Sequence, residues 1–168
     1  MNEMVAPSLP QVGDIAPAIA LPDDTGSLRD LTHERCRWVV LFFYPKDDTP
    51  GCTIEAKQFR DEYAAFEERD AVIWGISKLD SASKAAFKAK CGLPFPLLAD
   101  EDHDVSRRYG VWVAKVNYGR TSMGIHRATF LVDPEGRIAR VWASVTPDGH
   151  AVDVLARLDS LRASRSET

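Results

Sequence analysis

Seven consecutive apolar residues, Trp38 to Tyr44, constrain the fold of this chain more than any other segment. The run is rich in β-branched and aromatic residues, and Pro45 ends it. Because the run is apolar on both faces, it is typical of a buried central strand, most often one in a parallel sheet. It is much shorter than the about 20 apolar residues that cross a bilayer. We therefore expect a sheet whose central strand is covered on both sides.

Patterns typical of helices and strands alternate along the rest of the chain. After Cys52, apolar residues recur at steps of three and four, which indicates the core face of an amphipathic helix. The resulting order, β-α-β-α and then β-β-α, predicts an α/β fold with a central mixed sheet and helices on both faces. The predicted elements are a strand at 38–44, a helix from Cys52 with Ala56, Phe59, Tyr63 and Phe66 on its core face, a strand at 71–77, a helix at 81–91, a short helix at 102–109, a hairpin of 129–133 and 137–142, and a final helix with Val152, Leu155, Leu158 and Leu161 on one side.

The length of the chain predicts a single domain. Its 168 residues match the usual size of one domain, and 45% hydrophobic residues are enough to fill a core. We expect residues 1–168 to form one domain with its core at about 10–161. The small and charged residues 163–168 are expected to fray.

Charge and cysteine content exclude several classes of protein. The 21 basic and 25 acidic residues give a formal net charge of −4, which argues against a nucleic-acid partner. Three cysteines are an odd and sparse set for a secreted disulfide scaffold. Residues 1–14 lack the apolar core of a signal peptide. We therefore expect a cytoplasmic protein that binds neither nucleic acid nor membranes.

The segment around Cys52 carries the strongest chemical signal. This cysteine follows the buried strand and a loop with two prolines and a glycine, and it opens the long helix. At such a place the backbone N–H groups and the positive end of the helix dipole favour a thiolate over a thiol. Most free cysteines are inert core residues. The polar loop and the helix start favour a reactive cysteine here.

Ionisation of the thiol cannot by itself explain an enzyme. Lowering a thiol pKa from about 8.5 to about 6 raises the thiolate fraction at pH 7 about thirtyfold. The accompanying loss of nucleophilicity is about tenfold, because reactivity falls with pKa. The net gain is a few-fold, against the 10⁶ or more that is typical of enzymes. Donors that orient the substrate and stabilise its leaving group must supply the larger part.

Several motifs resemble those of peroxiredoxins. Pro45, Thr49 and Cys52 match the active-site signature P-x-x-x-T-x-x-C of that family. The fuller run F-Y-P-K-D-D-T-P-G-C-T at 43–53 is similar to the bacterioferritin comigratory protein, or peroxiredoxin Q, subfamily. An arginine segment that contains Arg127 lies 75 residues after the cysteine and matches as well. Further matches are Val12-Gly13-Asp14, Ala16-Pro17, Leu21-Pro22-Asp23, Tyr109-Gly110-Val111-Trp112, Met123-Gly124-Ile125-His126-Arg127 and Thr129-Phe130-Leu131-Val132-Asp133.

The resemblance implies a thioredoxin-like fold and a peroxidase that uses no metal and no bound organic cofactor. It assigns Cys52 as the nucleophile that attacks a hydroperoxide and becomes a sulfenic acid. Thr49 would bind the peroxide by a hydrogen bond, Pro45 would shield the site, and Arg127 would supply cationic donors. Glu55 matches a polar residue that lies near this arginine in many relatives.

The thiol that resolves the sulfenic acid is left open by the sequence. Many members of the subfamily carry a resolving cysteine five residues after the nucleophile, where this chain has Lys57. Others carry it in the helix after the next strand, at a position near Lys88, and Cys91 lies three residues further. Reaching Cys91 requires local unwinding, because a disulfide needs Cα atoms within about 7 Å. An external thiol and Cys36 are the alternatives, although Cys36 is more readily interpreted as a residue packed just before the central strand.

The resemblance also implies partners, and two rival functions are weighed against it. It implies a hydroperoxide substrate, recycling by thioredoxin or a similar thiol reductant, and a monomer. A dithiol–disulfide oxidoreductase on the same fold would need C-x-x-C, but Thr49 stands where the first thiol would be. A redox sensor or binding module switched by oxidation of Cys52 stays open, as does a one-cysteine peroxidase without an internal resolver.

The remaining polar residues give no metal signature. Lys46, Asp47 and Asp48 match the loop of the family, although a hydrated loop explains them equally well. His126 is interpreted as a solvated surface residue. The four histidines, His33, His103, His126 and His150, form no metal-binding spacing with the cysteines.

Overall fold

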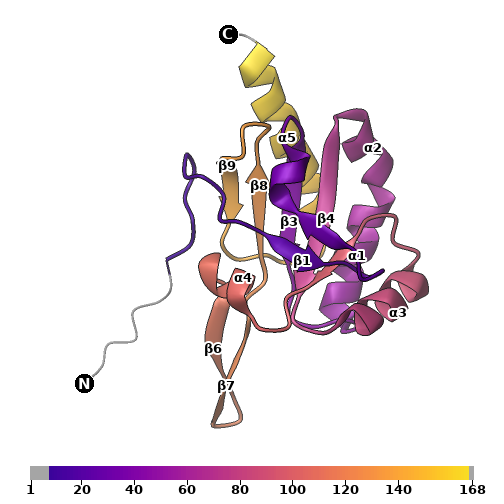
Figure 1. The fold of residues 1–168 in the computed structure, drawn as a ribbon, viewed down its shortest axis with the longest axis vertical. Coiled ribbons are helices and arrows are strands. Elements are labelled where there is room, and N and C mark those ends of the chain that lie inside the picture. Colours follow the sequence, from indigo (N-terminus) through magenta and orange to yellow (C-terminus); the bar gives the residue numbers. More distant parts are fainter. Residues whose placement is uncertain (1–7, 167–168) are drawn as a thin grey trace.

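A mixed β-sheet forms the centre of the computed structural model, which describes residues 8–166. Within these residues the sheet has five strands in the order β5-β4-β3-β8-β9 (Figure 1). The central strand β3 runs parallel to β4 and antiparallel to β8. All six residues of β3 are buried, which confirms the buried central strand predicted from the apolar run. The strands are β3 (Trp38–Phe43), β4 (Ala71–Ser77), β5 (Leu97–Ala99), β8 (Ala128–Val132) and β9 (Ile138–Trp142).

Helices and short strands cover the two faces of this sheet. Alternate residues of β3 divide between two apolar clusters, because successive side chains of a strand point to opposite faces. One cluster joins the sheet to α1, α2, α3 and α5, and the other joins it to η1, α4 and the N-terminal segment. This arrangement confirms the predicted α/β class. The helices are η1 (Leu31–Glu34), α1 (Pro50–Asp61), α2 (Tyr63–Glu68), α3 (Ser81–Cys91), α4 (Asp104–Arg108) and α5 (His150–Ser166).

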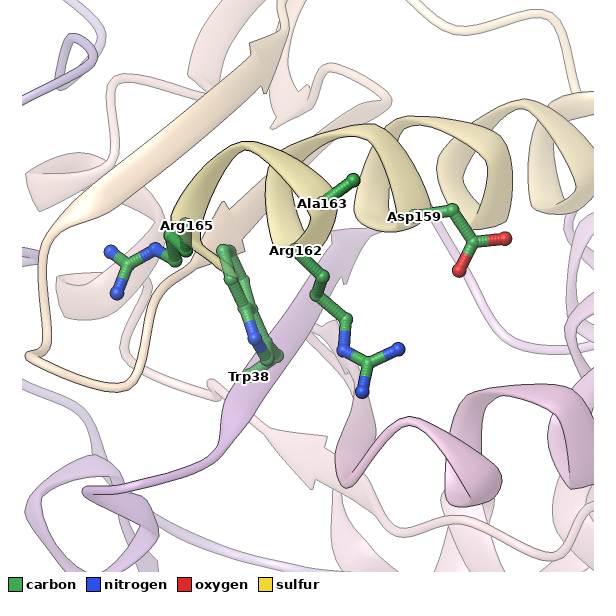
Figure 2. Close-up of a pocket in the computed structure, with 5 residues that line it drawn as sticks. All are labelled: Trp38, Asp159, Arg162, Ala163 and Arg165. Atoms are coloured by element: carbon green, nitrogen blue, oxygen red, sulfur yellow. The ribbon is translucent and has the colours of Figure 1, made fainter. Parts of the chain in front are cut away.

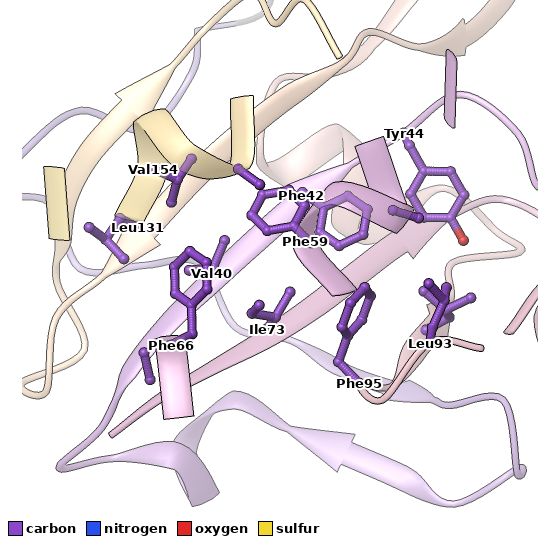
Figure 3. Packing of buried hydrophobic residues seen from close by; sticks show 14 of the residues in the cluster. Val40, Phe42, Tyr44, Phe59, Phe66, Ile73, Leu93, Phe95, Leu131 and Val154 are labelled. Atoms are coloured by element: carbon purple, nitrogen blue, oxygen red, sulfur yellow. The ribbon is translucent and has the colours of Figure 1, made fainter. Parts of the chain in front are cut away.

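Aromatic packing fixes the position of α1 on the sheet. Phe59 of α1 stacks on Phe42 of β3 with 4.8 Å between ring centroids, and both rings are buried. Such a pair contributes about 0.5–1.5 kcal/mol beyond its buried area. Figure 3 shows this cluster extending from Val154 and Leu131 at one end to Tyr44 and Leu93 at the other. The packing places the N-terminus of α1 beside the end of β3.

The long helix predicted from Cys52 differs from the observed one at both ends. It begins earlier, at Pro50, because proline suits the first position of a helix, where no N–H is needed. It also breaks at Glu62, whose backbone leaves helical geometry, so that Tyr63 and Phe66 belong to the separate helix α2. At the other end of the chain, residues 163–166 are the last residues of α5. Residues 167–168 of the expected tail lie outside the described residues.

Five short or exposed strands were not predicted. Strands β1 (Ala20–Pro22), β2 (Leu28–Asp30) and β5 have three residues each, too few to show a period. Strands β6 (Trp112–Asn117) and β7 (Arg120–Ile125) form a hairpin that extends away from the central sheet (Figure 1). Its two turn residues, Tyr118 and Gly119, both have positive φ, as a type I′ turn requires.

Among residues 8–166, no helix is long and apolar enough to span a membrane.

Candidate active site

Cys52 lies in the first turn of α1, just beyond the loop that follows β3. We call residues 44–49 the active-site loop. The loop ends at Thr49, whose extended backbone caps α1. The first N–H groups of a helix have no partner within the helix, and they carry its positive dipole end. Cys52 therefore occupies the helix start that the sequence predicts, although its side chain is buried, with an exposed fraction of 1%.

Arg127 connects the sulfur of Cys52 to the carboxylate of Glu55. Its Nη2 donates to Cys52 Sγ at 3.3 Å, and its Nη1 donates to Glu55 Oε1 at 2.6 Å. The guanidinium comes from the segment between β7 and β8, 75 residues after the cysteine. The Arg127 side chain has an exposed fraction of 14%, whereas the cysteine that it contacts is buried. The structure thus brings together three of the five predicted catalytic residues.

Gly51 leaves room for the guanidinium of Arg127. A Cβ atom at position 51 would lie 3.1 Å from Arg127 Nη2, which is tighter than ordinary van der Waals contact. A larger residue would require the guanidinium to shift by a few tenths of an ångström. The glycine of the motif therefore has a steric role at the site.

Glu55 is the most strongly perturbed acid of the site. Its side chain is fully buried, and its Oε2 has no hydrogen-bond partner among residues 8–166. Burial raises the pKa of the Glu55 carboxyl to about 7, although Arg127 offsets part of the shift. Burial lowers the pKa of Arg127, but Glu55 and Cys52 outweigh it, so the net shift is upward. Arg127 therefore stays charged while Glu55 changes its charge near neutral pH.

Replacing Glu55 by glutamine should change how stability depends on pH. Above its ordinary pKa of 4.5, the carboxyl of the unfolded chain has lost its proton, whereas the folded chain holds it until about pH 7. The free energy of unfolding should therefore fall by up to about 3 kcal/mol as pH rises from 4.5 to 7. Glu55→Gln should lack this fall, because an amide keeps one charge state. Urea unfolding at pH 5 and pH 8 checks this. If the free energy of unfolding changed equally between these pH values in the two proteins, the prediction would be contradicted.

Thr49 and Pro45 lie on the active-site loop, and both precede Cys52 in the sequence. The Thr49 hydroxyl donates to the backbone carbonyl of Lys46 at 3.1 Å. It gives no side-chain hydrogen bond to the helix that it caps. With its proton bound to a carbonyl, this oxygen can accept a hydrogen bond from a substrate. Pro45 is partly buried at the start of the loop.

Asp47 is buried, although a hydrated loop was one interpretation of its sequence. It accepts hydrogen bonds from Tyr44 Oη at 2.5 Å and from Ser83 Oγ at 2.8 Å. Lys84 Nζ of α3 lies 3.2 Å from Asp47 Oδ2, the same oxygen that accepts from Ser83. Burial, together with the charge of Asp47, raises the pKa of Tyr44 well above its ordinary value. Sequence reasoning missed these partners, because a lysine in a polar helix looks like a surface residue.

The three cysteines, all within the described residues, are free thiols in different surroundings. Cys91 ends α3 and is buried in the apolar cluster that also contains Cys52. Its carbonyl accepts a hydrogen bond from Arg60 of α1 at 2.7 Å. Cys36 is exposed, with a left-handed φ of 78°, so its interpretation as a packed residue is wrong. It precedes β3, so a six-residue strand of about 20 Å separates it from the loop.

A second positive side chain faces the site from the β6–β7 hairpin. Lys115 Nζ donates to the carbonyl of Ile125 at 2.5 Å, two residues before Arg127. Burial lowers the pKa of Lys115, and the charges of Lys78 and Arg127 lower it further, against the attraction of Cys52. No sequence pattern marked this residue, because the hairpin that carries it was not predicted. Lys115 adds to the positive field around Cys52.

An open pocket of about 560 Å³ lies elsewhere, along the last turns of α5. Figure 2 shows Trp38 under these turns, with Arg162 and Arg165 on either side of its ring. The guanidinium of Arg165 is 5.0 Å from the ring centroid. Trp38 begins β3, whereas Cys52 follows the end of that strand. The pocket contains none of the predicted site residues.

Comparisons with known proteins show to which family the chain is similar. The sequence pattern described as the AhpC/TSA family matches residues 12–141. A putative peroxiredoxin bcp of Coxiella burnetii is 46% identical, covering 88% of this chain and 98% of that protein. Peroxiredoxin Bcp of Bacillus subtilis is 42% identical, covering 90% of this chain and 96% of that protein.

Solved structures agree as well. A structure of the bacterioferritin comigratory protein of Xanthomonas campestris, described in connection with alkyl peroxide reduction, has a TM-score of 0.81 and 38% identity. The match covers 84% of this chain and 90% of that protein. Sequence pattern, curated relatives and solved neighbours thus lead to one conclusion. The chain belongs to the AhpC/TSA family and, within it, to the Bcp or peroxiredoxin Q group of thioredoxin-fold peroxiredoxins.

Proposed function

We propose that Cys52 is the nucleophile with which this thiol-dependent peroxidase reduces hydroperoxides. The observation that carries the proposal is the single guanidinium of Arg127, which contacts both Cys52 Sγ and Glu55. Arginine keeps its charge at all relevant pH values, and its fork of N–H groups is rigid. Its donors can therefore stabilise the thiolate first and then an oxygen of the bound peroxide.

The reaction transfers one oxygen atom. The Cys52 thiolate attacks the terminal oxygen of R–O–O–H, an S–O bond forms, and the O–O bond breaks. The sulfur is oxidised to a sulfenic acid, and the peroxide is reduced to an alkoxide that takes up a proton and leaves as an alcohol, or as water when R is hydrogen. Charge develops on the leaving oxygen, where Arg127 and the first N–H groups of α1 are the donors at hand.

The other predicted residues have supporting roles in this proposal. Glu55 fixes the orientation of Arg127 through the 2.6 Å contact. The Thr49 oxygen accepts the hydrogen bond of the peroxide O–H, which places the reacting oxygen in line with the sulfur. Pro45 limits access of water at the start of the active-site loop. Because Cys52 is 1% exposed, a substrate reaches it only with a small displacement of these neighbours.

Cys91 is the proposed resolving thiol. The thiol of Cys91 would attack the sulfenic sulfur of Cys52, so that an S–S bond forms and water leaves. Both cysteines belong to one apolar cluster, which supports their pairing. The first turn of α1 has to unwind for them to meet. Thioredoxin or a similar dithiol would then reduce the disulfide by thiol exchange.

One equivalent of hydrogen peroxide, followed by peptide mass spectrometry without reductant, tests this assignment. Wild-type protein should give a Cys52–Cys91 cross-link, and Cys91→Ser should accumulate a sulfenic acid at Cys52 that dimedone traps. Cys36→Ser is the control and should behave like wild type. A sulfenic acid that persists in wild-type protein would show that an external thiol is the resolver instead. Trapping at a cysteine other than Cys52 would refute the choice of nucleophile.

We also propose that the protein acts in the cytoplasm as a single-domain monomer. The net charge of −4 supports the absence of a nucleic-acid partner. Light scattering of the reduced and oxidised protein tests the oligomeric state, and a stable dimer in either form would contradict the proposal.

A further inference from the structure

The contact between Asp47 and Lys84 joins the active-site loop to α3. Both side chains are almost completely buried, with exposed fractions of 2% for Asp47 and 0% for Lys84. Lys84 Nζ lies 3.2 Å from Oδ2 and 3.5 Å from Oδ1 of the carboxylate. The hydroxyls of Tyr44 and Ser83 donate to the same carboxylate. Three donors from two elements, the active-site loop and α3, thus meet at one buried acid.

The chemistry of peroxide reduction does not use this ion pair. A buried pair is weak evidence for added stability, because desolvation offsets the attraction between the charges. Loss of one partner is strongly unfavourable, since it leaves an uncompensated charge in the core. The pair therefore fixes the position of Asp47. As long as this carboxylate is ionised, its charge is compensated only where it contacts Lys84.

The position of Asp47 determines the conformation of the active-site loop, on which the reaction depends. Asp47 lies two residues before Thr49 and five before Cys52. At the start of the loop, the Tyr44 N–H donates to Ile76 of β4 at 3.1 Å. At its end, α1 begins directly after Thr49. Asp47 is the anchored point between these two ends, so its position sets that of the Thr49 hydroxyl and of the first turn of α1.

We propose that Lys84 is a positioning residue of the active site. By holding Asp47, it keeps the active-site loop and the first turn of α1 in the arrangement that reacts with peroxide. The same contact opposes the unwinding of the first turn of α1 that brings Cys52 to its resolving thiol, Cys91, on the last turn of α3. This second part rests on the proposed role of Cys91. Lys84 thus favours the first step of turnover and opposes the second.

Lys84→Met tests the proposal, and the chain offers a matched control. Lys90 of the same helix pairs with Asp48 of the same loop at 2.7 Å, but the two side chains are 64% and 52% exposed. Exposed pairs contribute little. Lys84→Met should speed amide exchange at residues 46–53 at least tenfold and slow oxidation of Cys52 by hydrogen peroxide at least tenfold in stopped flow. Lys90→Met should change either rate less than twofold.

Disulfide formation provides a readout of opposite sign. Rapid quench and mass spectrometry should show that Lys84→Met converts the sulfenic acid to the Cys52–Cys91 disulfide at least threefold faster than wild type. Val154→Ala, which opens a cavity under α5, lowers overall stability without touching the loop and should leave this rate unchanged. If no disulfide forms in any variant, the assignment of Cys91 fails, while exchange and oxidation still decide the role of Lys84.

A double substitution keeps the proposal testable if Lys84→Met alone fails to fold. Asp47→Asn combined with Lys84→Met removes the pair without leaving an isolated charge, and it should show the same faster exchange and slower oxidation. The proposal is overturned if exchange and oxidation in this double variant match those of Lys90→Met. It is also overturned if oxidation slows while exchange at residues 46–53 stays at the wild-type rate, because the loop would then not be the route.

Discussion

Replacing Cys52 by serine should abolish peroxide reduction, with a loss of at least about 10⁴-fold in the rate constant, which is less than the acceleration of 10⁶-fold or more that is typical of enzymes. A serine oxygen cannot accept an oxygen atom from the peroxide, and its hydroxyl is barely ionised at neutral pH. The substitution exchanges a buried sulfur for a smaller oxygen that can still accept from Arg127, so the fold should persist.

The measurement for Cys52→Ser is the consumption of hydrogen peroxide at pH 7 with a dithiol reductant in excess. Cys36→Ser is the matched control, because it removes an exposed thiol at the opposite end of β3, and it should retain wild-type activity. Circular dichroism should be the same for all three proteins. Peroxide consumption that survives in Cys52→Ser would overturn the proposed nucleophile and place the activity on another thiol.

Replacing Arg127 by alanine should lower the rate of Cys52 oxidation about 10² to 10³-fold, the loss that follows removal of a donor to a developing oxyanion. The variant removes the donor at 3.3 Å from Sγ and also the partner of the buried Glu55. Loss of thiolate explains only a few-fold change, because reactivity falls as ionisation rises. The rest reflects donors that hold the peroxide.

Two measurements on Arg127→Ala separate these effects. Absorbance at 240 nm gives the thiolate fraction of Cys52, and stopped-flow fluorescence gives its rate of oxidation. Because the variant leaves Glu55 without its cation, Arg127→Ala combined with Glu55→Gln should show the same loss in a protein without that buried acid. His126→Ala, an exposed neighbour, is the control and should retain the wild-type rate. If rate and thiolate fraction fell by the same factor, orientation of the peroxide would not be the main effect.

The elements that the sequence predicted well are those whose side chains report their surroundings directly. β3 could be recognised because all of its residues are buried and apolar. The core face of α1 was visible in Ala56 and Phe59, which are fully buried. The three-residue strand β5 gave no such signal, since three residues cannot distinguish a strand from a loop. Its place beside β4 depends on the rest of the fold.

The residues of the site also divide into those that the sequence could identify and those that it could not. Cys52, Glu55 and Arg127 could be named from motif and resemblance, and the structure joins them through two hydrogen bonds. Lys84 could not, because its partner Asp47 lies 37 residues away and neither residue has a local pattern that marks it as buried. Pairing of distant charges is decided by the packing of helices on the sheet. A single sequence contains no direct record of that packing.

The exposed cysteine before β3 has a practical consequence for handling this protein. Cys36 is the one thiol of the three, all of which the structure describes, that is open to reagents in the folded state. In air-oxidised stocks, bridges between molecules should therefore form at this residue first. Covalent dimers on a non-reducing gel would then report storage history rather than turnover, and Cys36→Ser is the background in which to prepare samples for redox titration.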